Sequence, residues 1–140
     1  MGEVPKRGWR GYISSREQGG HFIPQRVQNL VIRDYAARHG LLFLLSAVEY
    51  YMDDCTMMLR ALVDEADSLA GILFYSTHLL PKDPVVREQL WQQVRERDFT
   101  LRFALEELVV ADAQGITAME DLLLVRDLTE NRSDFDLVDR

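Results

Sequence analysis

The chain has 140 residues, with 23 Asp and Glu against 16 Lys and Arg, and a net charge of −7 at pH 7. A protein that neutralises nucleic-acid phosphates normally gathers positive charge, so this composition argues against a nucleic-acid partner. The single cysteine, Cys55, excludes an internal disulfide, and no apolar run is long enough to cross a membrane. We therefore expect a cytoplasmic protein that does not associate with a membrane.

Four short apolar or alternating segments, each followed by a helical pattern, occupy the middle of the chain. This order predicts a single three-layer α/β domain, with a parallel sheet of about four strands and helices on both faces. We expect strands at 11–14, 41–46, 69–75 and 99–105, and helices at 24–38, from 53 or 54, at 84–97 and at 117–128. The continuously apolar run 41–46 is typical of a strand buried on both faces, whereas 99–105 alternates and fits a position nearer an edge.

The two ends of the chain differ in composition from this domain. Residues 1–9 contain Gly2, Pro5 and Gly8 and are expected to form a flexible arm. The α/β domain is expected to span 10–128, and the acidic residues 129–140 to form a tail that frays.

Polar side chains follow the predicted strands at the point where each strand ends. The carboxyl ends of parallel strands meet at one rim of the sheet, where open α/β sheets bind ligands. Arginines and free N–H groups near a helix N-terminus suit a phosphate or carboxylate, so we expect an anionic small molecule to bind here. Alternatively, the arginines pair with surface carboxylates. The candidate binding residues are Ser14, Ser15, Arg16, His21, Gln25, Arg26, Asn29, Arg33, Tyr50, Ser76 and Thr77.

Three further side chains at this rim are candidates for moving protons. Glu49 follows a buried strand between Val48 and Tyr50, where its pKa could be raised enough for acid or base catalysis; alternatively it caps the next helix. His78 is a candidate proton carrier or a structural hydrogen-bonding group, and Glu106 ends the fourth strand.

No metal or cofactor is expected. The three histidines lack metal-ligand spacing, and the chain contains no glycine-rich dinucleotide motif, phosphate-binding loop or nucleophile elbow.

Several segments resemble the sporadic carbohydrate cluster proteins. The similarity covers residues 11–128 and is carried by Gly11–Arg16, Val27–Leu30 and Tyr75–Pro81. This resemblance implies a role in bacterial gene clusters for surface polysaccharides and unusual sugars, but no particular reaction.

The chain also resembles the catalytic domain of serine recombinases, which opens with a Gly-Tyr strand and a serine-bearing turn. That resemblance implies a resolvase-like or flavodoxin-like arrangement of strands and helices. The active-site pattern departs from the family, because Tyr12 and Ile13 stand two residues before Ser14 and Ser15 where the family has arginine. The segment 76–80 also lacks the family's arginines, so the resemblance implies a shared fold with a different task.

Two hypotheses follow from these patterns and resemblances. In the first, the protein is a cofactor-independent isomerase, epimerase or lyase in carbohydrate biosynthesis, acting on a sugar phosphate or nucleotide-linked sugar. Arg16 would hold the anion, and Glu49 with His78 or Glu106 would move protons. In the second, it is a non-catalytic oligomerisation or partner module for a sugar-pathway enzyme, since the apolar run 122–125 exceeds what one helix face needs. DNA strand exchange is a third and disfavoured hypothesis. The small predicted sheet favours a homo-oligomer, most simply a dimer, in which a partner subunit covers one face or edge.

Overall fold

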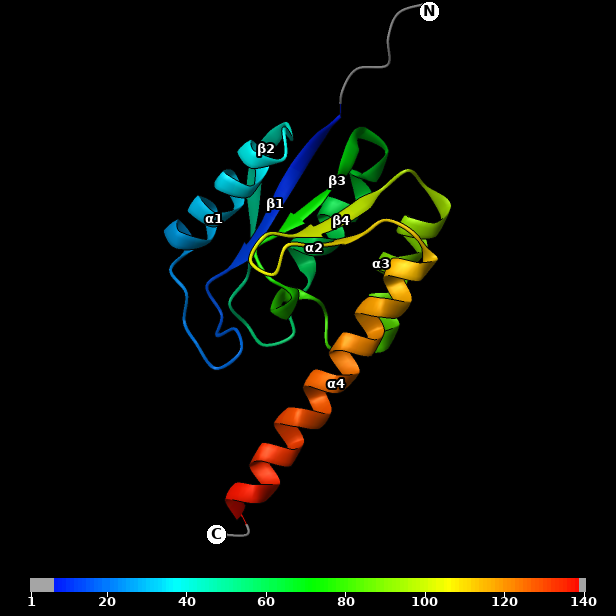
Figure 1. Ribbon diagram of the computed structural model, residues 1–140. Helices are drawn as coiled ribbons and strands as arrows, with labels where there is room; N and C mark the ends of the chain where they lie inside the picture. Colours follow the sequence, from blue (N-terminus) through cyan, green and yellow to red (C-terminus); the bar gives the residue numbers. More distant parts are fainter. Residues whose placement is uncertain (1–6, 139–140) are drawn as a thin grey trace, which may run out of the picture.

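The computed structural model describes the backbone of residues 7–138 and the side chains of residues 7–130. Within this range a five-stranded sheet has the order β2-β1-β3-β4-β5 (Figure 1). Its strands are β1 (Gly8–Ser14), β2 (Phe43–Glu49), β3 (Leu69–Phe74), β4 (Thr100–Phe103) and β5 (Leu108–Val110). The first four strands are parallel and β5 is antiparallel to β4, which confirms the predicted α/β domain with a mostly parallel sheet.

The helices cover both faces of this sheet, as predicted. They are α1 (Gln25–Arg38), α2 (Met57–Asp64), α3 (Pro84–Glu96) and α4 (Ala113–Val138), with two short 3-10 turns, η1 (Ala66–Ser68) and η2 (Thr77–Leu79). The strand register places Arg102, which contacts α1, and Glu49, which contacts α2, on opposite faces. The helices α3 and α4 pack together beside β5, and α4 extends well past the rest of the domain (Figure 1).

The strand β2 lies at an edge of the sheet, contrary to the expectation that it is buried on both faces. The register slips between Trp9 and Gly11 of β1, which pair with Phe43 and Ser46, so β2 carries an extra residue there. Leu45 within this irregular stretch is 77% exposed. An edge position and a bulge explain how an apolar strand remains partly open to solvent.

The strand β5 was not predicted from the sequence. The chain turns after Phe103 through Glu107, whose φ of 58° lies in the left-handed region, and returns along β4 for three residues. Three residues are too few to show a period-2 pattern. The fourth predicted strand, 99–105, is correspondingly shorter in the structure.

The long helix α4 begins earlier and ends later than predicted. Its start is set by Asp112, whose carboxylate accepts a hydrogen bond from the backbone of Gly115 at 2.8 Å. The backbone stays helical through Val138, into the stretch expected to be a tail. Residues 1–6 of the expected arm lie outside the described part of the chain, and β1 already begins at Gly8. None of the helices in residues 7–138 is long and apolar enough to span a membrane.

Aromatic side chains from three neighbouring strands form the centre of the core. Tyr12 packs edge-on against Phe74, with ring centroids 5.2 Å apart, and Phe74 stacks on Phe103 at 4.9 Å. On the next strand pair, a Cβ atom at Gly71 would lie 1.8 Å from the carbonyl oxygen of Thr100, so β3 and β4 can approach this closely only with glycine there. The tight packing of β1, β3 and β4 places the ends of these strands side by side.

Candidate functional site

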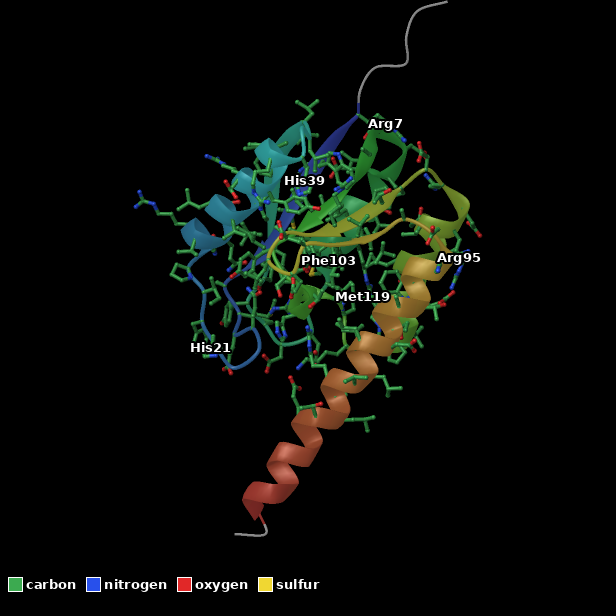
Figure 2. All side chains as sticks on the ribbon, in the orientation of Figure 1. Arg7, His21, His39, Arg95, Phe103 and Met119 are labelled. Carbon is green, nitrogen blue, oxygen red and sulfur yellow. The ribbon has the colours of Figure 1, made fainter. Side chains whose placement is uncertain are left out.

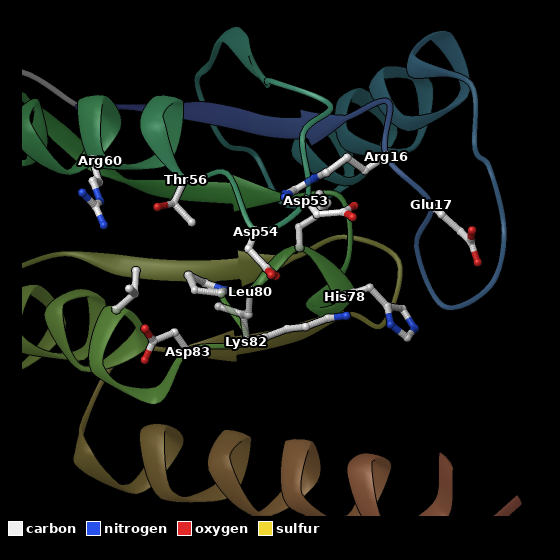
Figure 3. Close-up of a pocket in the computed structure, with 13 residues that line it drawn as sticks. Arg16, Glu17, Asp53, Asp54, Thr56, Arg60, His78, Leu80, Lys82 and Asp83 are labelled. Carbon is white, nitrogen blue, oxygen red and sulfur yellow. The ribbon is translucent and has the colours of Figure 1, made fainter. Parts of the chain in front are cut away.

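Two adjoining clefts open at the edge of the sheet where β1, β2 and β3 end. The first cleft has a volume of about 720 Å³ and is lined by Arg16, Arg60 and Lys82, among others. Figure 3 shows Arg16 and Asp53 on one side of it and Lys82 and His78 on the other. The second cleft, about 680 Å³, lies between the loop 17–20, Lys82 and Arg126 of α4.

Ser14, at the end of β1, is closed off from both clefts. Its side chain is fully buried, and its hydroxyl oxygen accepts hydrogen bonds from the backbone N–H and the Nε of Arg16, both at 3.1 Å. Its carbonyl oxygen accepts bonds from Gln28 at 2.6 Å and from Gln18 at 3.3 Å. Ser14 therefore holds the loop after β1 in place, whereas Ser15 beside it is exposed.

Glu49, at the end of β2, is bound by donors on every side. The carboxylate is 1% exposed and accepts hydrogen bonds from the Tyr12 hydroxyl at 2.7 Å and from the backbone N–H groups of Tyr50, Met58 and Leu59, each at 3.1 Å. Two of these N–H groups belong to the first turn of α2, which has no other side-chain cap.

The pKa of Glu49 is lowered, and the expectation of a raised pKa is wrong. Burial by itself raises this pKa, but the hydrogen bonds from Tyr12, Met58, Leu59 and Tyr50 outweigh burial because they favour the ionised carboxylate. Burial and the bond to Glu49 in turn raise the pKa of Tyr12, which keeps its hydroxyl protonated as a donor. This geometry fits the alternative interpretation, in which Glu49 caps the helix that follows it.

Glu106 ties the turn after β4 to the end of β3. Its carboxylate accepts hydrogen bonds from the hydroxyls of Ser76 and Thr77, both at 2.7 Å, and from the backbone N–H of Thr77 at 3.1 Å. Ser76 and Thr77 are themselves buried. Ser76, Thr77 and Glu106, which were all predicted at this rim, therefore lie together. Their polar groups are hydrogen-bonded to one another.

Arg126 brings α4 to the same place. Its guanidinium donates to the Thr77 hydroxyl at 2.7 Å and lies 3.3 Å from Nδ1 of His78. Burial and the charge of Arg126 lower the pKa of His78 from its usual 6.5, so the imidazole is neutral at pH 7. His78 and Thr77 line the second cleft together with Arg126.

The remaining predicted binding residues do not line either cleft. Asn29 accepts a hydrogen bond from the Ser46 hydroxyl at 2.7 Å, and Arg33 lies over the ring of Phe43. His21 lies at the outer end of the loop that follows β1 (Figure 2). Exposed side chains away from the clefts are those of Gln25, Arg26 and Tyr50. Of the predicted set, only Arg16, His78 and Thr77 line a cleft.

Most residues that line the clefts were not predicted from the sequence, among them Gln18, Arg60, Lys82 and Arg126. Arg126 stands in a helix 48 residues after His78, so only the packing of α4 brings the two together. Among these residues, only Lys82 had a local sequence signal for a place at the clefts, because it directly follows Pro81 in the third strand-end loop. Among the side chains of residues 7–130, no group of three or more His, Cys, Asp and Glu is arranged to hold a metal ion.

The fold is similar to that of two solved recombinase structures. One is the N-terminal catalytic domain of TP901-1 integrase, with a TM-score of 0.54 and 15% identity over 87% of this chain and 97% of that one. The other is a resolvase family site-specific recombinase from Streptococcus pneumoniae, with a TM-score of 0.56 and 9% identity over 91% of this chain and 94% of that one. The chain therefore has a resolvase-like fold. Comparisons with protein families and with curated proteins find no match.

These comparisons overturn the expected role in carbohydrate biosynthesis. No family matches the chain, so the resemblance to sporadic carbohydrate cluster proteins is unsupported. The similar structures are recombinase domains, which contradicts both the acid–base enzyme acting on sugar phosphates and the partner module of a sugar pathway. The expectation of a sugar-type anionic ligand with no nucleic-acid partner is corrected for the same reason. It had relied on the net charge of the whole chain, which is −7.

Proposed function

We propose that this chain is a recombinase-fold domain that binds the phosphates of a nucleic acid at its two clefts without cleaving the strand. One of the similar structures is named a site-specific recombinase and the other an integrase catalytic domain, and site-specific recombination is a reaction on DNA. From those names we take the class of ligand, which is a nucleic acid. The absence of cleavage is inferred from the serines of this chain.

The observation that carries the proposal is the pairing of the basic side chains. Away from the clefts, five arginines form ion pairs, such as Arg95 with Glu88 and Arg97 with Asp67, whereas Arg26, Arg33 and Arg102 form none among the described residues. At the clefts, the charged groups of four basic residues have no carboxylate within 4 Å among the described side chains: Arg16, Arg60, Lys82 and Arg126. Four carboxylates also line each cleft, so an anionic partner would bind at the four cations that these carboxylates leave unpaired.

Strand cleavage is not supported by the serines at this edge. Ser14 is buried and bonded to Arg16, so its hydroxyl cannot reach a phosphate. Ser15 is exposed, but within the described part of the chain its hydroxyl has neither a base to take its proton nor a bonded cation. Binding without a phosphoserine intermediate is therefore the expected behaviour.

Fluorescence anisotropy with short labelled DNA tests the binding. We expect weak, salt-sensitive binding, with a slope of log K against log salt of about −3 for four contacts to a single strand. The double variant Arg60→Ala, Lys82→Ala should raise the Kd about tenfold. The control Arg95→Ala, Arg97→Ala removes the same charge from paired arginines outside the clefts. Equal losses in both double variants, or no binding by the parent chain, would overturn the proposal.

A nicked duplex tests the absence of cleavage separately. After incubation and denaturing electrophoresis, we expect the labelled strand to remain unattached to protein. A covalent band that disappears in Ser15→Ala would contradict the non-cleaving assignment and make Ser15 a nucleophile.

A further inference from the structure

His78 lines both clefts, and its imidazole is held from two sides. On one side, the guanidinium of Arg126 lies 3.3 Å from Nδ1. On the other side, Gly19 packs so closely that a Cβ atom there would lie 2.8 Å from Cε1 and Nε2 of the ring. Figure 3 shows His78 and Lys82 along the same wall of the first cleft. The imidazole is therefore part of the surface that an anion bound in the clefts would meet.

The contact with Arg126 determines the protonation state of this imidazole. A guanidinium has only N–H donors, so Nδ1 of His78 accepts in this contact and carries no proton. The neutral ring then has its single proton on Nε2. A proton on Nδ1 would bring two donors and two positive charges together. Protonation of His78 therefore requires the guanidinium of Arg126 to move away from Nδ1.

Charged groups from three parts of the chain act on His78. Burial and the positive charges of Arg126 and Lys82 lower its pKa, whereas the carboxylates of Glu106 and Glu130 act in the opposite direction. The other carboxylates that line the clefts are those of Glu17, Asp53, Asp54, Asp83 and Asp127. Within the protein alone the balance favours the neutral ring, so an added negative charge beside the ring would shift the balance towards the imidazolium.

We infer that His78 is a further phosphate-binding residue of the clefts, which takes up one proton when a nucleic-acid strand binds. This inference rests on the proposed nucleic-acid binding and deepens it, because it makes that binding depend on pH. A phosphodiester bound by Lys82 and Arg126 would draw the guanidinium away from Nδ1, and its negative charge would favour the imidazolium. The proton passes from solvent to Nδ1, and the new N–H donates to a phosphate oxygen.

The affinity of the clefts for a strand should therefore increase as the pH falls. The pKa of His78 is lowered in the free protein, and the bound phosphodiester raises it again. Between these two pKa values the complex holds one proton more than the free protein, so a lower pH favours the complex. A phosphodiester keeps its single negative charge throughout this range, so the change in affinity comes from the protein.

Fluorescence anisotropy at pH 7.5 and 5.5, with short labelled DNA that has no terminal phosphate, tests this coupling. We expect the parent chain to bind about fivefold more tightly at pH 5.5. The slope of log K against log salt should also become more negative by about 0.7, the value for one added contact to a single strand.

His78→Asn keeps an acceptor for Arg126 but cannot take up a proton, so its affinity should change less than about twofold between the two pH values. This variant also corrects for any protonation of the carboxylates that line the clefts. His39→Asn is the matched control, because His39 stacks on Tyr35 and lies outside both clefts. It should keep the full pH effect.

An NMR titration of the parent chain replaces the variant if His78→Asn does not fold, as judged by circular dichroism. The imidazole signal of His78 should give a pKa higher by about one unit with DNA than without it. Equal pH effects in the parent chain and in His78→Asn, or an unchanged pKa of His78 in the complex, would overturn this inference and leave the proposed function standing. Absence of binding to any DNA at either pH would overturn both.

Discussion

The two halves of the strand-end edge use similar residues in opposite ways. Beside β2, the Glu49 carboxylate is surrounded by donors, and each of its oxygens accepts at least two bonds. Beside β3 and α4, the Gln18 oxygen has no donor and the guanidinium of Arg126 has no carboxylate. A carboxylate whose donors all come from the protein stabilises the fold, whereas a guanidinium without a carboxylate at a cleft can pair with an anion.

Glu49→Gln should produce the largest change, and it tests the first half of this comparison. An amide cannot accept from four donors, and its NH₂ group would face N–H groups of the α2 backbone. We expect a loss of about 3 kcal/mol in the free energy of unfolding, and a Tm lower by about 10 °C. Glu107→Gln is the control, because Glu107 pairs with Arg38 at the surface and should cost less than about 1 kcal/mol. Calorimetry on both variants measures the difference; equal stabilities would remove Glu49 from its structural role.

Glu106→Gln should have an intermediate effect, because its donors come from only two residues. Both hydroxyls bond Oε2, so an amide oxygen at that position would still accept from them, whereas the NH₂ group at the Oε1 position would face the Thr77 N–H. We expect a loss of about 2 kcal/mol by urea denaturation. If the Kd of this variant for DNA rises in proportion to its loss of stability, Glu106 also shapes the cleft through Thr77. A loss in the free energy of unfolding as large as that of Glu49→Gln would contradict the ranking of the two variants.

The pH dependence of stability should give the smallest effect, and it concerns His78. The folded state lowers the pKa of His78 below 6.5, so the unfolded chain binds more protons just below pH 6.5. Stability from this group is therefore present above pH 6.5 and decreases as the pH falls through this value towards the lowered pKa. Between pH 7 and 5.5 the parent chain should lose about 1–2 °C of Tm more than His78→Asn. Parallel pH profiles of the two proteins would contradict this assignment.

The sequence predicted the layers of the fold better than its edges. Alternating strand and helix patterns placed β1, β2, β3 and β4 and their parallel direction correctly. The position of β2 at an edge could not be predicted, because strand order depends on which strands pair. The brief strand β5 carries no periodic signal, and its turn depends on a left-handed residue, Glu107, that is not a glycine.

At the candidate site, the sequence placed polar side chains at the strand ends but did not predict the contacts that each of them makes. Glu49 was found from its place after an apolar strand, yet its donors are backbone N–H groups of α2, which no side-chain pattern reveals. Arg16 and His78 were found because they follow strands directly. Arg126 was not, because a basic residue in an exposed helical pattern gives no sign of which loop it will contact.

The attachment of α4 also has a mechanical consequence. Among the residues whose side chains are described, Arg126 is the last one in this helix that bonds to the body of the domain. Beyond it the backbone continues as helix to Val138, a length of about 18 Å at 1.5 Å per residue. A tilt of this helix by about 10° about Arg126, beside the second cleft, would therefore move the far end of the helix by about 3 Å.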